Sequence, residues 1–175
     1  MKFVLRAIVA TAIVLIIAMW VYALFFASKV SVNKFEDRNW AVRAQERCLV
    51  AREERKSLSD YRVVDSLGKD ALAERADLID LATDTIENFV KEFRLTLPSD
   101  PKGRELVGLW LDDYELDDYE IYIADRREFS NSLRAGINER FSETPIEGLP
   151  ISEKIATFAA DNEMSYCKPP IDLSI

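Results

Sequence analysis

Two cysteines, Cys48 and Cys167, are the residues of this chain with the most distinctive chemistry. An even number of cysteines in an exported domain can oxidise to a disulfide, whereas cytosolic thiols stay reduced. A bridge between them would close a loop of about 120 residues and, on the chain-entropy model, contribute about 4–5 kcal/mol to stability. The alternative is a pair of buried free thiols. Given export of the domain, we predict the bridge.

Catalytic and metal chemistry have little support in the sequence. The chain contains no histidine, which removes the commonest general base and any Ser–His or Cys–His nucleophile pair. It also lacks a Cys-x-x-Cys pair and a phosphate-binding glycine loop. Paired carboxylates serve glycoside hydrolysis, but among 31 acidic residues a chance pair carries no information. We therefore predict a protein that is not an enzyme, with no catalytic residue, no metal site and no cofactor.

An acidic tandem repeat offers a possible cation site. Leu111–Glu115 and Leu116–Glu120 have the same sequence, and Glu105–Asp125 holds eight acids and no base. Five residues rotate a helix by about 140°, so equivalent carboxylates point in different directions. The spacing also lacks the alternating acids and central glycine of a calcium loop. We interpret the repeat as a solvated helical face on which Asp113 and Asp117 are a like-charge pair.

A second charged segment, Asp125-Arg126-Arg127-Glu128, could form an anion site. Alternating charges on a helix are usually a solvated face, and we interpret this segment in that way.

Helices must position the cysteines. Residues at steps of three and four place Cys48 on the apolar face of a first soluble helix, namely Trp40, Ala44, Cys48, Ala51, Arg55 and Leu58. Neither glycine nor proline occurs before Gly68, which we take as the end of this helix.

The clearest periodicity belongs to a second helix. Its apolar positions alternate steps of four and three in the series Leu72, Ala76, Ile79, Thr83, Ile86, Val90 and Phe93. Leu78, Leu81, Ala82 and Phe89 widen the stripe, so we expect burial between two other helices rather than a bare coiled coil.

A third helix is expected from Pro101 to about Leu133, with Asp100 as its cap and Pro101 in the first helical position. Its expected core contacts are Leu106, Trp110, Tyr114, Ile121, Phe129 and Leu133. Gly136 ends it, residues around 144–150 form a loop, and Ser152 opens a short last helix with Ile155, Phe158 and Ala159 facing inward.

An uncharged run from Ala7 to Ser28 precedes these helices. At 1.5 Å per residue it spans about 33 Å, against a hydrocarbon core of about 30 Å. A cleaved signal peptide is the alternative, but the run exceeds a typical signal core and no small-x-small cleavage site follows Phe25 and Phe26. We predict a transmembrane helix over residues 7–28, which contacts the lipid bilayer.

Basic residues alone do not decide the orientation, because Lys2 and Arg6 face Lys29, Lys34 and Arg38 across the run. The short leading flank and the aromatic residues near the far end favour a cytoplasmic amino terminus. The predicted organisation is a cytoplasmic tail (1–6), the transmembrane helix (7–28) and an extracytoplasmic helical domain (29–175).

The fold class that follows is all-α: an N-terminal transmembrane helix, then an antiparallel bundle of three long helices and one short C-terminal helix. Of 23 basic residues two precede the apolar run, so the remainder carries 21 basic against 31 acidic residues, a net charge of −10. This charge disfavours nucleic acid and anionic lipid headgroups as partners. Lys29–Lys69 is net basic and Asp70–Asp125 strongly acidic, which predicts that the first soluble helix lies against the acidic pair.

Four segments carry a resemblance to a known family: Asn39–Ala44 leading to Cys48, Asp60–Asp65, Ala124–Glu128, and Ile151–Lys154 continuing through Phe158–Met164 to Cys167. On these residues the chain resembles an uncharacterised actinobacterial family of small single-span membrane proteins. The resemblance implies a bacterial plasma-membrane protein with an extracytoplasmic helical domain, and it implies no activity. Relative to that family we expect five extra residues here, which fits a duplication.

Two classes of function remain. The first is a non-enzymatic, membrane-anchored module that acts as an accessory or interaction subunit for other membrane or envelope proteins. The second is a sensory or ligand-binding domain with a pocket between helices, for which a pocket lined by Trp40, Trp110 or Tyr166 would be the evidence. The sequence does not settle whether the protein forms a homo-oligomer.

Overall fold

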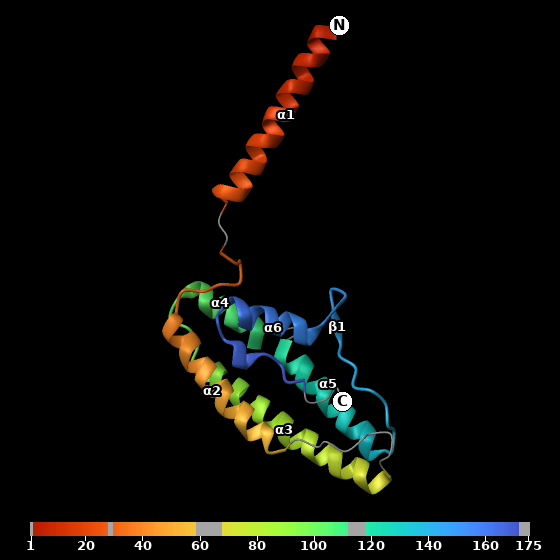
Figure 1. Cartoon of the computed structure of the whole chain (residues 1–175). Helices are drawn as coiled ribbons and strands as arrows, with labels where there is room; N and C mark the ends of the chain where they lie inside the picture. The colour runs from red at the N-terminus through yellow and green to blue at the C-terminus, as the bar shows by residue number, and fades with distance from the viewer. Residues whose placement is uncertain (1, 28–29, 59–67, 112–117, 172–175) are drawn as a thin grey trace. The chain divides into compact units, whose positions relative to one another are not determined.

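The computed structural model describes residues 2–27, 30–58, 68–111 and 118–171 and is mostly helical there (Figure 1). The helices are α1 (Lys2–Phe25), α2 (Arg38–Lys56), α3 (Lys69–Leu95), α4 (Pro101–Leu111), α5 (Asp118–Arg134), α6 (Ile151–Asp161) and the short 3₁₀ helix η2 (Ser165–Cys167). Strands β1 (Pro145–Ile146) and β2 (Leu149–Pro150) form an antiparallel hairpin within the predicted loop. The chain divides into two compact units, Met1–Val32 and Asn33–Ile175. The all-α fold class is confirmed.

The first unit contains α1, a 24-residue apolar helix whose described side chains are all exposed. It is long and apolar enough to cross a membrane. The helix begins before the uncharged run, at Lys2, and ends at Phe25. An exposed apolar surface of this extent is unfavourable in water and favourable in lipid.

The apolar face predicted for α2 is buried, including Trp40, Ala44, Cys48 and Ala51. Arg55 is buried on the same face with 8% of its surface exposed. The expected end at Gly68 is wrong. α2 ends at Lys56, where Ser57 donates both its N–H and its hydroxyl to Glu54 O, and Gly68 instead precedes α3 as its N-cap.

All seven periodic positions of α3 are buried, so this prediction is confirmed. Helix α3 contacts α2, α4 and α5, which places it between other helices as the wide stripe predicted (Figure 1).

The sequence predicts a single helix, the third, over this segment, but the structure has two described helices there, α4 and α5. The rings of Trp110 in α4 and Tyr119 in α5 meet edge to face, with centroids 5.1 Å apart. Nine residues of one straight helix would advance about 13.5 Å, so these two helices turn relative to each other. Tyr114, an expected core residue, lies outside the described residues, as do both members of the expected like-charge pair, Asp113 and Asp117.

Two aspartates cap neighbouring helices and bind each other's loops. Asp37 accepts hydrogen bonds from Trp40 N in α2 and from Ser99 N and Oγ. Asp100 accepts from Gly103 N in α4 and from Asp37 N. The capping role predicted for Asp100 is confirmed, and the hydrogen bonds to Asp37, from Ser99 foremost, hold its carboxyl pKa at about 2.

The core is dominated by what we call the aromatic core, seven rings in mutual contact contributed by five helices and the segment before α2. Its members are Phe35, Trp40, Phe89, Phe93, Trp110, Tyr119 and Phe158. Each is at most 7% exposed. As predicted, α6 adds Ile155, Phe158 and Ala159 on its inward face.

Candidate functional site

The segment Ser165–Ile171, which we call the C-terminal strap, lies along α2 and α5. At one point Cys167 meets Cys48 of α2, with the sulfur atoms at disulfide distance and the Cα atoms 5.0 Å apart. Both side chains are buried, Cys48 fully and Cys167 with 1% exposed. The two residues predicted to form the bridge are therefore adjacent in the fold, although 119 positions separate them in sequence.

Hydrogen bonds hold the strap on both sides of Cys167. The Tyr119 hydroxyl donates to Cys167 O, and the Tyr122 hydroxyl donates to Pro170 O at 3.0 Å. Gln45 of α2 accepts from Tyr166 N at 2.8 Å and donates to Ser165 Oγ at 3.1 Å. The strap is thus fixed to α2 and α5 through backbone and side-chain atoms as well as through the cysteines.

Tyr119 is a dependable donor in this arrangement. It is 1% exposed, and burial raises the pKa of its phenol well above the ordinary range. The hydroxyl therefore keeps its proton at any physiological pH and continues to donate to Cys167 O.

An open groove of about 320 Å³ lies between the end of α2 and the strap. We call it the cationic groove. Its lining consists of Arg52, Arg55, Lys56, Ser165, Tyr166, Lys168, Pro169, Pro170 and Ile171. Among the described residues that line it, four are basic and none is acidic, in a domain whose net charge is strongly negative.

The basic side chains of the groove are held in different ways. The Arg52 guanidinium lies over the Tyr166 ring, 5.3 Å from its centroid. Arg55 is buried and donates from Nη1 to Thr85 Oγ1 at 3.0 Å. Lys56 is exposed and pairs with Glu53 at 2.6 Å, and Lys168 is exposed.

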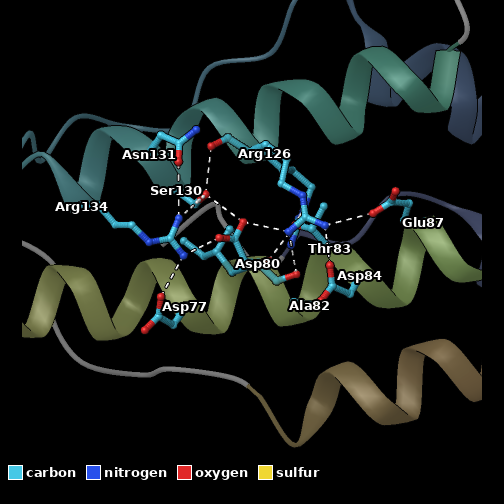
Figure 2. A network of polar contacts seen from close by, with 12 residues as sticks. Asp77, Asp80, Ala82, Thr83, Asp84, Glu87, Arg126, Ser130, Asn131 and Arg134 are labelled. Atoms are coloured by element: carbon cyan, nitrogen blue, oxygen red, sulfur yellow. Dashed lines mark hydrogen bonds and ion pairs between the residues drawn. The ribbon is translucent and has the colours of Figure 1, made fainter.

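A second polar assembly joins α3 to α5, and we call it the α3–α5 polar interface (Figure 2). It consists of Asp77, Asp80, Asp84 and Glu87 on α3 with Arg127, Ser130 and Arg134 on α5. Asp80 is central, because its carboxylate accepts from Arg127, Arg134 and Ser130. Partial burial raises the pKa of Asp80, but these hydrogen bonds outweigh it and leave the pKa below its ordinary value.

This assembly corrects two interpretations made from sequence. Arg126 and Arg127 do not lie on a solvated face: Arg126 is fully buried and donates to Thr83 Oγ1 at 2.9 Å and to the Tyr122 hydroxyl at 3.3 Å. The first soluble helix, α2, does pack against the acidic helix α3, as predicted, and Arg47 pairs with Glu92 there. The expected charge matching is corrected, because the other acidic residues of α3 that form ion pairs with a neighbouring helix in the described residues pair with arginines of α5. The physical reason is proximity, since α5 packs along the acidic side of α3 and places its arginines within contact distance (Figure 2).

The acidic repeat falls partly outside the described residues, at positions 112–117. Its described second half differs from the solvated face that we expected. Asp118 is buried and accepts from Lys154 Nζ at 2.8 Å, and burial raises its pKa. Tyr119 lies in the aromatic core, so only Glu120 of these three residues is exposed.

Within the ranges that the structure describes, no group of three or more carboxylates or cysteines is placed to hold a metal ion. The polar atoms of the α3–α5 polar interface bind one another. In the cationic groove, basic side chains lie next to an apolar wall formed by strap residues.

Sequence reasoning found the cysteines and named Tyr166 as a marker of a pocket, but it missed the groove. Arg55 was placed on the buried face of α2, and a buried arginine in an apolar stripe was the available signal. Lys168 lies more than 100 positions away in sequence, so only the fold brings it beside α2.

Comparison of the chain with family models, with curated proteins and with solved structures finds no match. The resemblance to an actinobacterial family therefore stays a prediction, and the function rests on the geometry described above.

Proposed function

We propose that the protein is a non-enzymatic, membrane-anchored module of the bacterial plasma membrane. In this proposal α1 crosses the bilayer with its amino terminus in the cytoplasm. The unit Asn33–Ile175 is then an extracytoplasmic domain that serves other membrane or envelope proteins as an accessory or interaction subunit.

One observation carries the proposal: the chain divides into an exposed apolar helix and a separate compact helical unit. The helix has the length and composition of a membrane span, and the second unit has its own aromatic core. Proximity of Cys48 and Cys167 supports export, because disulfides persist in oxidising compartments.

Topology is tested with engineered thiols and a membrane-impermeant maleimide on intact cells. In a Cys48→Ser/Cys167→Ser background, the reporter Leu95→Cys is used because Leu95 is 85% exposed, and Lys2→Cys is the matched control before the apolar run. We expect labelling of the Leu95 reporter in intact cells and of the Lys2 reporter only after permeabilisation. The reverse pattern contradicts the proposed orientation.

The bridge is tested separately in the native sequence. Cells are quenched in acid, free thiols are alkylated under denaturing conditions, and a maleimide polymer is added after reduction. Two polymer adducts per chain are expected if Cys48 and Cys167 are oxidised in the cell. A chain that takes no polymer after reduction held free thiols and contradicts the bridge.

The accessory role is tested by photo-crosslinking of the full chain in its native membrane. A crosslinkable residue at an exposed position of the second unit, such as Val50, is compared with one in the buried core, such as Val90. We expect a discrete adduct with another envelope protein from position 50 and none from position 90. Recovery of the chain alone from both positions contradicts the role.

The second candidate, a ligand-binding domain, is favoured by the cationic groove, because Tyr166 lines it. Trp40 and Trp110, the other residues named for such a pocket, lie in the aromatic core and are at most 2% exposed.

A further inference from the structure

We propose that the cationic groove is a binding site for a small phosphate-bearing molecule with an apolar substituent. The inference concerns a site that the accessory role does not use, and it does not depend on the orientation of the chain in the membrane.

Charge is the first argument. Arg52, Arg55, Lys56 and Lys168 converge on one groove of about 320 Å³, although the chain beyond the apolar run has a net charge of −10. Lys56 already pairs with Glu53, so Arg52 and Lys168 are the groove cations on which a bound anion would act. The acidic remainder does not abolish the local potential, because charges in solvent are screened over about 8–10 Å.

Geometry is the second argument. Stacking on Tyr166 engages the flat face of the Arg52 guanidinium and leaves the hydrogen-bonding edge for a ligand. Buried Arg55 lines the groove and donates to Thr85 Oγ1, so we do not count it as a ligand-binding group. Arg52, oriented by its stacking on Tyr166, can bind the oxygens of phosphate in a paired, directional manner.

The rigidity of the wall is the third argument. Pro169, Pro170 and Ile171 form the apolar side of the groove, and the Tyr122 hydroxyl fixes Pro170 O. The contact of Cys167 with Cys48 fixes the strap immediately before these residues. A preformed site loses less conformational entropy on binding than one that must assemble around its ligand.

Size and valence select the class of ligand. The volume lies at the lower end of the range for small-molecule pockets, about 300–1,000 Å³, and is too small for a folded partner. A single carboxylate matches one arginine, whereas phosphate carries up to two charges and three strong acceptor oxygens. Arg52 and Lys168 together, beside three apolar residues, therefore fit a phosphate ester better than a simple carboxylate.

The test uses the full chain in nanodiscs of zwitterionic lipid, with pyrophosphate as the soluble probe and citrate as the carboxylate probe of comparable charge. Calorimetry measures the affinities at fixed ionic strength. We expect saturable binding of pyrophosphate and at least tenfold weaker binding of citrate. Equal affinities of the two probes, or no saturable binding of pyrophosphate, would overturn the proposal.

Two variants with the same change in charge make the test specific to the groove. Arg52→Gln/Lys168→Gln removes two groove cations, and Arg43→Gln/Arg140→Gln removes two exposed cations that do not line it. We expect pyrophosphate affinity to fall at least tenfold in the groove variant and to stay within about twofold in the control. Equal losses in both variants would show non-specific attraction and sink the proposal, while unchanged thermal melting establishes that both variants are folded.

The source of the phosphate is distinguished by repeating the titration in nanodiscs that contain anionic phospholipid. A soluble ligand predicts an unchanged pyrophosphate affinity. A lipid headgroup in the groove predicts competition, hence a weaker apparent affinity that the groove variant does not show. Both outcomes keep phosphate as the chemistry, and neither bears on the labelling experiment that tests topology.

Discussion

The aromatic core and the α3–α5 polar interface share helix α3 but are held together by different forces. Near the carboxyl end of α3, Phe89 and Phe93 join five other rings that are almost fully removed from water. Towards its amino end, Asp77, Asp80 and Asp84 bind arginines while 70%, 23% and 52% of their side chains stay exposed. Burial of apolar area stabilises the first region, and short-range electrostatics between partly solvated groups acts in the second.

The free energy of folding and the specificity of helix packing therefore depend on different parts of α3. Aromatic side chains bury large areas and contribute most of the free energy, whereas exposed ion pairs each contribute under about 1 kcal/mol. The arginines favour one register of α5 on α3, because Arg127 pairs with Glu87 whereas Arg134 pairs with Asp77, nearly three turns away on α3.

The largest expected effect is in the aromatic core. Trp110→Ala removes a side chain that contacts Phe93, Tyr119 and Phe158, and the cavity should lower the free energy of unfolding by about 3–5 kcal/mol. Denaturant unfolding of the full chain in detergent, followed by near-ultraviolet circular dichroism, measures it. Leu95→Ala, at a position 85% exposed, is the control and should change stability by less than about 0.5 kcal/mol. Similar losses of unfolding free energy in the two variants would contradict the conclusion that the aromatic core contributes most of the stability.

The next effect is at a buried hydrogen bond between α3 and α5, from Arg126 to Thr83. Thr83→Val keeps the shape of a fully buried side chain but removes the acceptor of Arg126 Nε, which should cost about 1–3 kcal/mol. Thr157→Val is the matched control, because the exposed Thr157 hydroxyl donates only along its own helix, to Glu153 O. The same unfolding experiment measures this cost. An unchanged unfolding free energy for Thr83→Val would show that Arg126 has enough hydrogen-bond acceptors without Thr83.

A smaller effect is expected for Asp80→Asn. This change removes the charge of the carboxylate that accepts from Arg127, Arg134 and Ser130, and should cost about 1–2 kcal/mol at low salt. Asp77→Asn, on the same helix and 70% exposed, should cost less than about 0.5 kcal/mol. High salt should narrow the gap between the two variants, because it screens exposed charges. A salt-independent gap would mean that packing, and not charge, accounts for it.

The sequence predicted the first of these regions well and the second poorly. The series Leu72, Ala76, Ile79, Thr83, Ile86, Val90 and Phe93 has a helical period, so burial of that face followed directly. Trp40, Trp110 and Phe158 were also expected to face inward. Apolar residues strongly prefer burial, so a helical period of apolar positions directly indicates the buried face of the helix.

Charged residues have two satisfactory environments, water and an opposite charge, and their spacing on a helix is the same in both. The run Asp125–Glu128 was therefore read as solvated, although Arg126 is fully buried and Arg127 bridges three acids of α3. The grouping of Arg55 and Lys168 in the cationic groove could not be predicted either, because the fold, and not their spacing in the sequence, brings them together. The end of α2 was predicted wrongly for another reason: the C-cap residue is Ser57, and a serine is a weaker signal for a helix end than a glycine.

The smallest and most selective effect is in the pH dependence of stability. Hydrogen bonds leave the pKa of Asp80 below its ordinary value of 3.8, and those from Lys91 and Arg127 lower the pKa of Glu87 from 4.5. A carboxyl with a depressed folded pKa stabilises the protein above its unfolded pKa, and this contribution is lost as the pH falls through the folded pKa. The unfolding free energy should therefore decrease from about pH 4.5 downwards. Asp118 acts in the opposite sense because its pKa is raised.

The decrease of stability below about pH 4.5 distinguishes the contributions of the two regions of α3 in one experiment. The seven rings of the aromatic core carry no carboxyl, so Trp110→Ala should lower the whole stability curve without changing its slope below pH 4.5. Asp80→Asn removes one of the depressed carboxyls and should flatten the slope, leaving the contribution of Asp37, whose pKa is about 2, in place. Denaturant midpoints of the three proteins between pH 7 and pH 2 give the comparison. Parallel curves for wild type and Asp80→Asn would show that Asp80 does not contribute to the acid sensitivity, which would then belong to the other carboxyls with lowered pKa values, Glu87, Asp37 and Glu163.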